Sequence, residues 1–249
     1  KLVGSADGLL YVTFPNLDDG NCISAFTTRM GGVSRGKYAS MNMSFSNGDS
    51  SQAVRKNYDI LFGALGLDPE RSVFSHQTHT NNIRIVKEND IGKGIVIHRD
   101  YNNVDGLITN LKGVTLVTQF ADCVPLLFYD PEKEVIAASH AGWRGTVQEI
   151  GKKTVEAMES LYGCNPKTIK AAIGPSIGSC CYEVGEDFYA AFDAELREKF
   201  VIPTENGKYR ADLRAANLAL FDAAGVPRQN VDVSEDCTYC RADLYYSHR

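Results

Sequence analysis

A cysteine and a histidine flank two short apolar runs, and this stretch constrains the fold more than any other part of the chain. Cys123 precedes the run 126–129, and His140 follows the run 135–138. The turn 130–133 joins the two runs, which predicts a β-hairpin. Because a hairpin brings the residues before its first strand close to those after its second, we expect Cys123 and His140 to be neighbours. A thiol beside an imidazole is either a metal site or an activated nucleophile.

The remaining apolar patterns predict short strands and several helices without a strict alternation. Further strands are predicted at 9–14, 23–28, 73–75, 83–86, 106–109, 114–120, 169–173 and 231–233. Helices are predicted at 50–65, 145–161, 185–200 and 211–224. The first of them has Ser50 or Ser51 as its cap and Gly66 at its end. Without repeats or an obvious linker, the pattern predicts one α/β (α+β) domain, residues 1–249, with mixed sheets covered by helices.

Charge and cysteine usage exclude several classes of protein. The chain of 249 residues has a formal net charge of −5 and no long Lys/Arg run, so we expect neither a nucleic-acid nor a membrane partner. No apolar run approaches the length of a membrane span. The seven cysteines are odd in number and include an adjacent pair, which fits poorly with a secreted disulfide scaffold. We therefore expect a cytoplasmic protein.

Three residues could form a catalytic zinc site. Such a site needs about three protein ligands and an open position, and Cys123 and His140 supply two ligands. His79 is the best third candidate, because it lies at a strand end in the sequence His-Gln-Thr-His. If the backbone stays extended there, His76 points away from His79 and only one of them faces a given pocket. Asp122 and Asp105 are candidates for orienting a ligand or accepting a proton, although Asp105 is also a typical turn residue.

The same residues are also consistent with a mechanism that uses no metal. Cys123 would then be the nucleophile of a cysteine hydrolase, His140 its base, and His79 or Asp122 the orienting group. Either Cys123 or His140 alone is more often a buried structural residue. Their paired placement around one hairpin favours a functional site, but the sequence does not separate the two chemistries.

Other metal sites fit the sequence less well. Cys237 and Cys240 form a Cys-x-x-Cys motif that Cys180 and Cys181 could complete as a four-thiolate site. We disfavour it, because adjacent cysteines rarely bind one ion with good geometry. A multicopper oxidase needs several paired histidines, and the chain has five histidines with no His-x-His pair, so copper is less expected than zinc.

Two arginines are candidates for binding an anion. Arg29 lies at a predicted strand end beside the glycines 31–32, where a solvated surface charge is the more ordinary interpretation. Arg144 lies at the start of a predicted helix, where backbone N–H groups favour an anion.

Several motifs of this chain resemble those of the YfiH-like family, which is also called the laccase-domain or multicopper polyphenol oxidase family. The resemblance covers nearly the whole chain. The motifs that carry the resemblance are Thr-Arg-Met-Gly-Gly-Val-Ser (28–34), His-Gln-Thr-His (76–79), Asp-Gly-Leu-Ile-Thr (105–109), Ala-Asp-Cys-Val-Pro (121–125), His-Ala-Gly-Trp-Arg-Gly (140–145), Ile-Gly-Pro-Ser-Ile-Gly (173–178), Cys-Tyr-Glu-Val-Gly (181–185) and Cys-Thr (237–238). The chain departs from the family pattern at Thr80, where a glycine usually follows the histidine.

The resemblance implies a fold, a metal and an activity. It implies a layered α/β/β/α arrangement, similar to a CNF-like cysteine hydrolase fold, with zinc on His79, Cys123 and His140. It implies a purine nucleoside phosphorylase that acts on adenosine, inosine and methylthioadenosine and also deaminates adenosine, so purine nucleosides and phosphate are the expected partners. Phosphate would then contact Arg29 and Arg144, while Gln77 and Asp105 would contact base or ribose.

Overall fold

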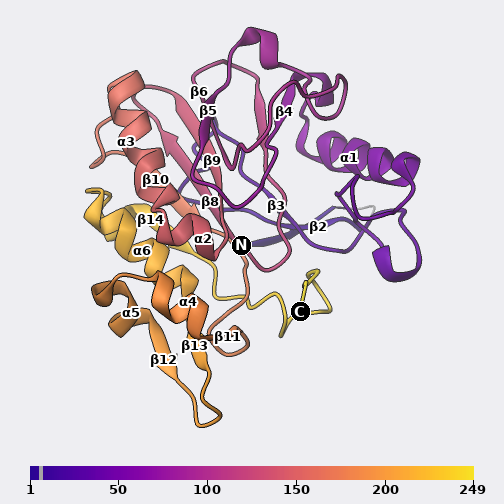
Figure 1. Ribbon diagram of the computed structural model, residues 1–249. Helices are drawn as coiled ribbons and strands as arrows, with labels where there is room; N and C mark the ends of the chain where they lie inside the picture. The colour runs from indigo at the N-terminus through magenta and orange to yellow at the C-terminus, as the bar shows by residue number, and fades with distance from the viewer. Residues whose placement is uncertain (6–7) are drawn as a thin grey trace.

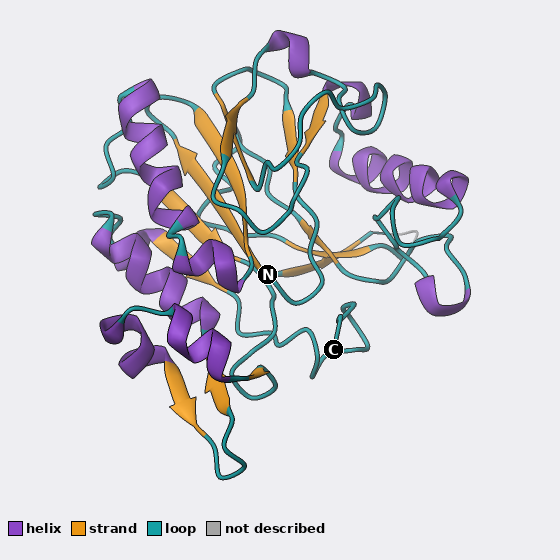
Figure 2. Ribbon diagram, viewed as in Figure 1, coloured by secondary structure: helices purple, strands orange, loops and turns teal. Residues whose placement is uncertain are grey.

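The computed structural model describes residues 1–5 and 8–249, and its largest sheet has six strands (Figures 1 and 2). The strands are β1 (Leu2–Gly4), β2 (Leu10–Val12), β3 (Phe26–Thr27), β4 (Ser72–Phe74), β5 (Ile83–Ile85), β6 (Gly106–Thr109), β7 (Thr115–Val117), β8 (Val124–Asp130), β9 (Val135–Ala141), β10 (Lys170–Ile173), β11 (Glu183–Val184), β12 (Val201–Pro203), β13 (Tyr209–Ala211) and β14 (Val231–Val233). The helices are α1 (Ser51–Leu65), α2 (Trp143–Val147), α3 (Ile150–Tyr162), α4 (Glu186–Ala191), α5 (Ala194–Phe200) and α6 (Leu213–Ala223).

The predicted hairpin is the centre of the large sheet. The strand order is β14-β10-β8-β9-β6-β5, with antiparallel pairing of β8 and β9. Asp130 closes the turn, because its carboxylate accepts the backbone N–H groups of Glu132 and Lys133 at 2.9 and 3.1 Å. Pro125 pairs with His140, so Cys123, one residue before β8, lies at the sheet edge where β9 delivers His140. The prediction that the hairpin makes these two residues neighbours is confirmed.

Both faces of the central sheet are covered. Along β8, Val124, Leu126 and Phe128 belong to the core shared with α3 and α6. Leu127 and Tyr129 face the opposite core, together with residues of β2. Because a strand with two buried faces needs apolar residues on both, β8 reads as a continuous apolar run. Figure 1 shows α2, α3 and α6 along one side of the sheet and α1 on the other, beyond β2, β3 and β4. The predicted mixed, layered fold is confirmed.

The ends of α1 follow the sequence signals. The Ser50 side chain accepts the backbone N–H of Ala53 at 3.4 Å, and Gly66 ends the helix with a φ of 66°. Val54, Tyr58 and Phe62 form its buried face, as helical spacing predicts. The structure therefore confirms both predicted caps. Among the described residues no helix is long and apolar enough to cross a bilayer.

Two predicted helices are each interrupted. The range 145–161 contains the end of α2 and most of α3, separated at Glu149, which has a φ of 59°. The range 185–200 contains α4 and α5, because the Asp193 carboxylate accepts the N–H of Leu196 at 3.0 Å and starts a new helix. The predictions missed the small sheet β11-β13-β12, whose strands have only two or three residues.

Candidate metal centre

Three side chains from separate segments converge at one edge of the central sheet. His79 lies in the loop between β4 and β5, Cys123 directly before β8, and His140 within β9. Each offers a ligand atom, and these atoms lie within 4.8 Å of one another. The imidazole rings of His79 and His140 meet edge to face, with centroids 4.9 Å apart. Two imidazoles and one thiol that converge in this way could hold one metal ion.

His140 is held in one orientation by Asp105. Its side chain is buried, and Nδ1 lies 2.9 Å from Asp105 Oδ1. An ionised carboxylate only accepts hydrogen bonds, so Nδ1 is the donor in this contact, and the tautomer that suits it leaves Nε2 free to bind an ion. The backbone N–H of His140 also bonds to the Asp105 carbonyl at 2.8 Å. A carboxylate behind an imidazole is the usual support of a metal-binding histidine.

Asp105 also shapes the loop that carries His79. Its buried carboxylate accepts the backbone N–H groups of Thr78, His79 and Thr80, each at 3.0 Å, and the Thr80 hydroxyl at 2.8 Å. Burial raises the pKa of Asp105, but the hydrogen bonds from His140, Thr78 and Thr80 outweigh it and lower the pKa to about 2. The wrapped loop gives His79 a φ of 63°, so the condition of an extended backbone is not met. These contacts favour an orienting role for Asp105 over contact with a substrate.

Cys123 is a protonated thiol in the absence of a cation. Burial raises its pKa to about 12, and the negative charges of Asp122 and Asp105 add to the effect. A metal ion reverses this preference, because a coordinating thiol loses its proton.

The Asp122 side chain forms hydrogen bonds with the C-terminal segment and none with a candidate metal ligand. Thr238 Oγ1 donates to its Oδ1 at 2.7 Å. Its Oδ2 accepts from Ser247 Oγ at 2.9 Å and from the backbone N–H groups of His248 and Arg249 at 2.7 and 3.2 Å. Asp122 itself has a φ of 84°. These contacts fix the turn from which Cys123 projects.

Gly142 is a residue of the site that the sequence predictions did not single out. A Cβ atom added there would lie 2.4 Å from His79 Nδ1 and 3.2 Å from Cys123 Sγ. Only a residue without a side chain leaves room for both groups. The available signal was its place two residues after His140 in His-Ala-Gly-Trp-Arg-Gly.

The surroundings keep His79 neutral and place a cation nearby. Burial lowers the pKa of His79, and the neighbouring His140 and Arg144 lower it further against the opposing charge of Asp105. Arg144 is exposed, with its guanidinium carbon 4.3 Å from the centre of the Trp143 ring. Within residues 1–5 and 8–249 Arg144 forms no ion pair, so its charge is available to an anion.

The other two predicted substrate residues have contacts within the protein. The Arg29 guanidinium donates to the carbonyl oxygens of Ala39 and Ala242. Gln77 pairs with the backbone of Gln119: its Oε1 accepts the N–H at 2.7 Å and its Nε2 donates to the carbonyl at 2.6 Å. Their roles in substrate binding stay predictions.

A cavity of about 1290 Å³ lies beside the three-residue cluster. It is lined by residues of β3, β7 and the C-terminal segment. Phe120 and Asp122, which lie close to the three-residue cluster, also line it. The Phe120 ring centroid is 5.5 Å from that of His140. None of the three candidate ligands lines this cavity, so its size alone does not make it the site of the chemistry.

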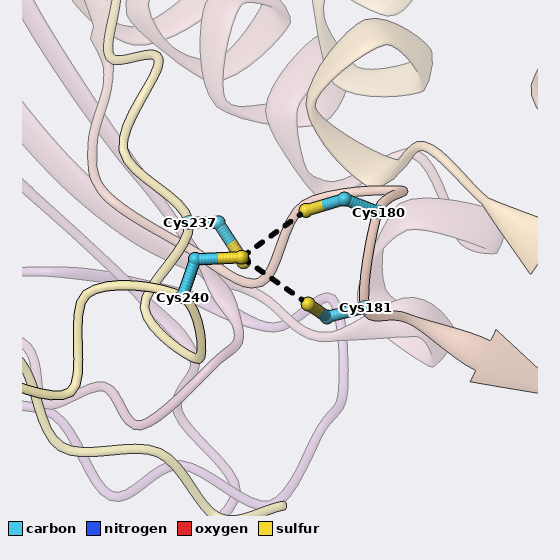
Figure 3. Close-up of side chains that lie close together, drawn as sticks. All are labelled: Cys180, Cys181, Cys237 and Cys240. Atoms are coloured by element: carbon cyan, nitrogen blue, oxygen red, sulfur yellow. Dashed lines mark hydrogen bonds between the residues drawn. The ribbon is translucent and has the colours of Figure 1, made fainter.

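Four other cysteines converge at the site that the sequence analysis disfavoured. The sulfur atoms of Cys180, Cys181, Cys237 and Cys240 all lie within 4.8 Å of one another (Figure 3). We disfavoured this site because adjacent cysteines rarely bind one ion with good geometry. Consecutive side chains point apart in an extended strand, but Cys180 and Cys181 lie in a turn.

The sequence model of one protein family, described as "Multi-copper polyphenol oxidoreductase laccase", matches residues 23–249. The chain belongs to this family. It is 37% identical over 237 residues to the purine nucleoside phosphorylase YlmD of Bacillus subtilis, covering 94% of this chain and 85% of the relative. It is also 36% identical over 235 residues to adenosine deaminase RL5 from an unknown prokaryotic organism, covering 91% and 88%.

A solved member of similar structure confirms the fold. The hypothetical protein YfiH of Bacillus licheniformis superposes with a TM-score of 0.91 at 33% identity, covering 100% of this chain and 93% of that one. The family description names copper. In the described residues, however, neither candidate metal cluster contains more than two histidines. The family resemblance stated from the sequence is confirmed, and at the departure from its pattern Thr80 adds a hydroxyl bond to Asp105.

Proposed function

We propose that this family member is a zinc-dependent purine nucleoside phosphorylase that acts on adenosine, inosine and methylthioadenosine and also deaminates adenosine. The observation that carries the proposal is the convergence of His79, Cys123 and His140 beside the unpaired cation Arg144. The 37% identity with a relative named purine nucleoside phosphorylase supports purine nucleosides and phosphate as the class of substrates.

The donor set fits zinc. Two imidazoles and a thiolate are ligands that zinc takes in catalytic sites, and three protein ligands leave a position for water or substrate. Multicopper chemistry needs more histidines than the pair His79 and His140 provides. When bound, zinc supplies a Lewis acid and makes a coordinated water more acidic. Asp105 would hold His140 in the tautomer whose Nε2 can bind the ion.

For phosphorolysis, a phosphate oxygen bonds to the anomeric carbon of ribose while the bond from that carbon to the purine nitrogen breaks. The proton that hydrogen phosphate gives up is taken by the leaving base, so the products are ribose 1-phosphate and the free purine. We assign phosphate binding to Arg144, because a guanidinium that forms no ion pair among the described residues suits a phosphate. Arg29, Gln77 and Asp105 remain our further candidates for substrate contact, although each is already bonded within the protein.

For deamination, water adds to the purine carbon that bears the amino group, and ammonia leaves. The 36% identity with a relative named adenosine deaminase favours this second activity. It needs no phosphate, so the two reactions of adenosine give different products: adenine from phosphorolysis and inosine from deamination.

A cysteine hydrolase without metal is the competing function. The proximity of Cys123 and His140 supports it. However, the raised pKa of Cys123 disfavours a thiolate that forms without a cation. Our proposal is supported if this cluster binds about one zinc ion and if a chelator abolishes the activity and added zinc restores it. Activity that survives the chelator and is abolished by iodoacetamide overturns it.

The direct test is the product analysis of adenosine incubated with zinc-loaded protein. We expect adenine and ribose 1-phosphate only when phosphate is present. Inosine should form without phosphate, and with phosphate hypoxanthine should accompany it, because inosine is itself a proposed substrate. Absence of all these products at any phosphate concentration contradicts the proposal.

The role of Arg144 is tested by Arg144→Ala and Arg144→Lys, with Arg55→Ala in the exposed part of α1 as control. We expect Arg144→Ala to raise the KM for phosphate by about tenfold or more and Arg144→Lys to recover part of the loss. Deamination should change little, because it uses no phosphate.

We also propose that residues 1–249 form one domain and that the protein is cytoplasmic. The free state of all seven cysteines, including the four that lie together, supports a reducing compartment.

A further inference from the structure

A second cluster of metal-binding side chains lies away from the hairpin. It consists of Cys180 and Cys181, in the turn between β10 and β11, and Cys237 and Cys240, in the loop after β14 (Figure 3). The Cys240 sulfur lies 3.7 Å from that of Cys180 and 3.4 Å from that of Cys181. We call these four residues the four-sulfur cluster.

The sulfur spacing matches a ligand shell around one ion. With zinc–sulfur bonds of about 2.3 Å, the sulfurs of a tetrahedral site are about 3.8 Å apart. Two disulfides would instead require sulfur pairs at about 2.05 Å. The measured distances of 3.4 and 3.7 Å are close to the edge of the tetrahedron.

A tight turn explains how two adjacent cysteines face the same point. The backbone N–H groups of Cys181 and Tyr182 both bond to the Gly178 carbonyl at 2.9 Å, so the chain is not extended there. A Cβ atom on Gly178 would lie 3.2 Å from Cys180 Sγ and 3.3 Å from Cys237 Cβ. Gly178 therefore lets the two segments approach closely. On the other segment, a bond of 2.9 Å from Arg241 N to the Cys237 carbonyl closes the Cys-x-x-Cys turn.

Backbone contacts hold the two segments in register before any ion binds. Ser176 forms a β-bridge with Cys237, and the N–H of Thr238 bonds to the Ser176 carbonyl at 3.1 Å. The N–H of Gly178 points at Cys237 Sγ at 3.2 Å, which stabilises charge on sulfur. The four sulfurs are therefore arranged by the fold and are not brought together by flexible loops.

The chemistry of the cluster selects a soft, four-coordinate ion. All four donors are sulfur, which favours zinc over magnesium or calcium. Cys180 and Cys240 are exposed, Cys181 is half-buried and Cys237 is buried, so the cluster can be reached from solvent. Arg210, whose guanidinium donates to the Cys180 carbonyl at 2.9 Å, lies close to the negative charge that four thiolates around a dication would carry.

We propose that Cys180, Cys181, Cys237 and Cys240 bind one zinc ion as a closed, structural four-thiolate site. Each thiol releases its proton to solvent as its sulfur binds the ion, so loading one ion releases up to four protons. The ion ties the loop before β11 to the segment after β14. That segment includes Thr238, which bonds to Asp122 beside Cys123. The proposal does not depend on the activity proposed above.

Metal content and cobalt spectra test the site on the full chain. We expect about two zinc ions per chain in the wild type, and about one in both Cys180→Ser/Cys240→Ser and Cys123→Ser. Cys22→Ser is the control and should retain both. With cobalt(II) in place of zinc, the intense thiolate-to-cobalt absorption should persist in Cys123→Ser and disappear in the double variant.

An alkylation experiment on the wild type protects the test against a variant that fails to fold. Zinc-loaded protein should resist iodoacetamide at Cys180 and Cys240, and chelator-treated protein should react there, because both cysteines are exposed. Equal alkylation with and without zinc overturns the proposal. Equal metal content in the wild type and in a folded double variant also overturns it. A mass spectrum that shows disulfides within the four-sulfur cluster has the same consequence. Loss of zinc from the hairpin site alone counts against the proposed function and leaves this site intact.

Discussion

The two clusters differ in how many donors they offer and in what surrounds them. The cluster of His79, Cys123 and His140 has three donors of two chemical kinds, supported by Asp105 and close to Arg144. The four-sulfur cluster has four identical donors, held by backbone turns and by the β-bridge between Ser176 and Cys237. A zinc ion with four protein ligands has no position left for a substrate, whereas one with three has. The contrast distinguishes the position that we propose to be reactive from the one that we propose to be structural.

The largest expected effect comes from Cys123→Ser. A serine hydroxyl is a much weaker zinc ligand than a thiolate, so the variant should lose the ion at the hairpin. We expect kcat/KM to fall about 1000-fold or more, equivalent to about 4 kcal/mol of transition-state stabilisation. Steady-state kinetics and metal analysis measure it, with Cys22→Ser as the matched control. Activity within tenfold of wild type would remove the functional distinction between the clusters.

Gly142→Ala tests how closely the three-donor cluster is packed. The added methyl would lie 2.4 Å from His79 Nδ1, and the exposed His79 ring can move away at little cost to the fold. The φ of −67° at Gly142 is acceptable for alanine. We therefore expect zinc affinity at this cluster to fall by about 10- to 100-fold with an unchanged midpoint of thermal unfolding.

The control for this substitution is Gly63→Ala in α1, where a methyl group meets nothing within 4 Å. Unchanged zinc affinity in Gly142→Ala would mean that His79 is not a ligand in the observed position. The four-sulfur cluster should retain its ion in both variants.

Asp105 makes the stability of the segments around the three-donor cluster depend on pH in the acid range. Its pKa is lowered from 3.8 to about 2, so its contribution to stability is complete above pH 4 and is lost as the pH falls toward 2. The contribution is about 2 kcal/mol. We expect urea unfolding of metal-free protein to show this loss and Asp105→Asn to lack it. An equally steep decline in Asp105→Asn would assign the pH dependence to other carboxylates.

Thr238→Val tests the connection between the clusters and should have the smallest effect. Thr238 lies between Cys237 and Cys240, and its buried hydroxyl donates to Asp122 at 2.7 Å. Loss of this bond should cost about 1–2 kcal/mol of stability and change kcat/KM by less than about tenfold. Thr238→Ser keeps the hydroxyl and is the matched control. If both variants equal the wild type in urea unfolding, the two clusters are not coupled through this bond.

The sequence was sufficient for elements whose signals are local. The β8–β9 hairpin, the caps of α1 and the proximity of Cys123 and His140 all follow from patterns within about 30 residues. Helix interruptions were missed at Glu149 and Asp193, because the apolar spacing continues across both breaks. The strands of the small sheet are too short to produce a recognisable alternation.

Long-range contacts account for the features of the sites that could not be predicted. The conformation of His79 depends on Asp105, which lies 26 residues away and collects three consecutive backbone N–H groups. The convergence of Cys180 and Cys181 depends on a turn that is packed against Cys237. Neither the acceptor nor the packing partner is visible in the residues next to the histidine or the cysteines.

The anchoring of Asp122 has a consequence for biosynthesis. The groups that donate to its carboxylate lie 116 to 127 positions further along the chain. Contacts over such spans form late, because the intervening chain must be closed into a loop first. While the ribosome still holds residues 238–249, the turn that presents Cys123 has none of these donors. Ion insertion at the hairpin should therefore follow the emergence of residues 238–249 from the ribosome.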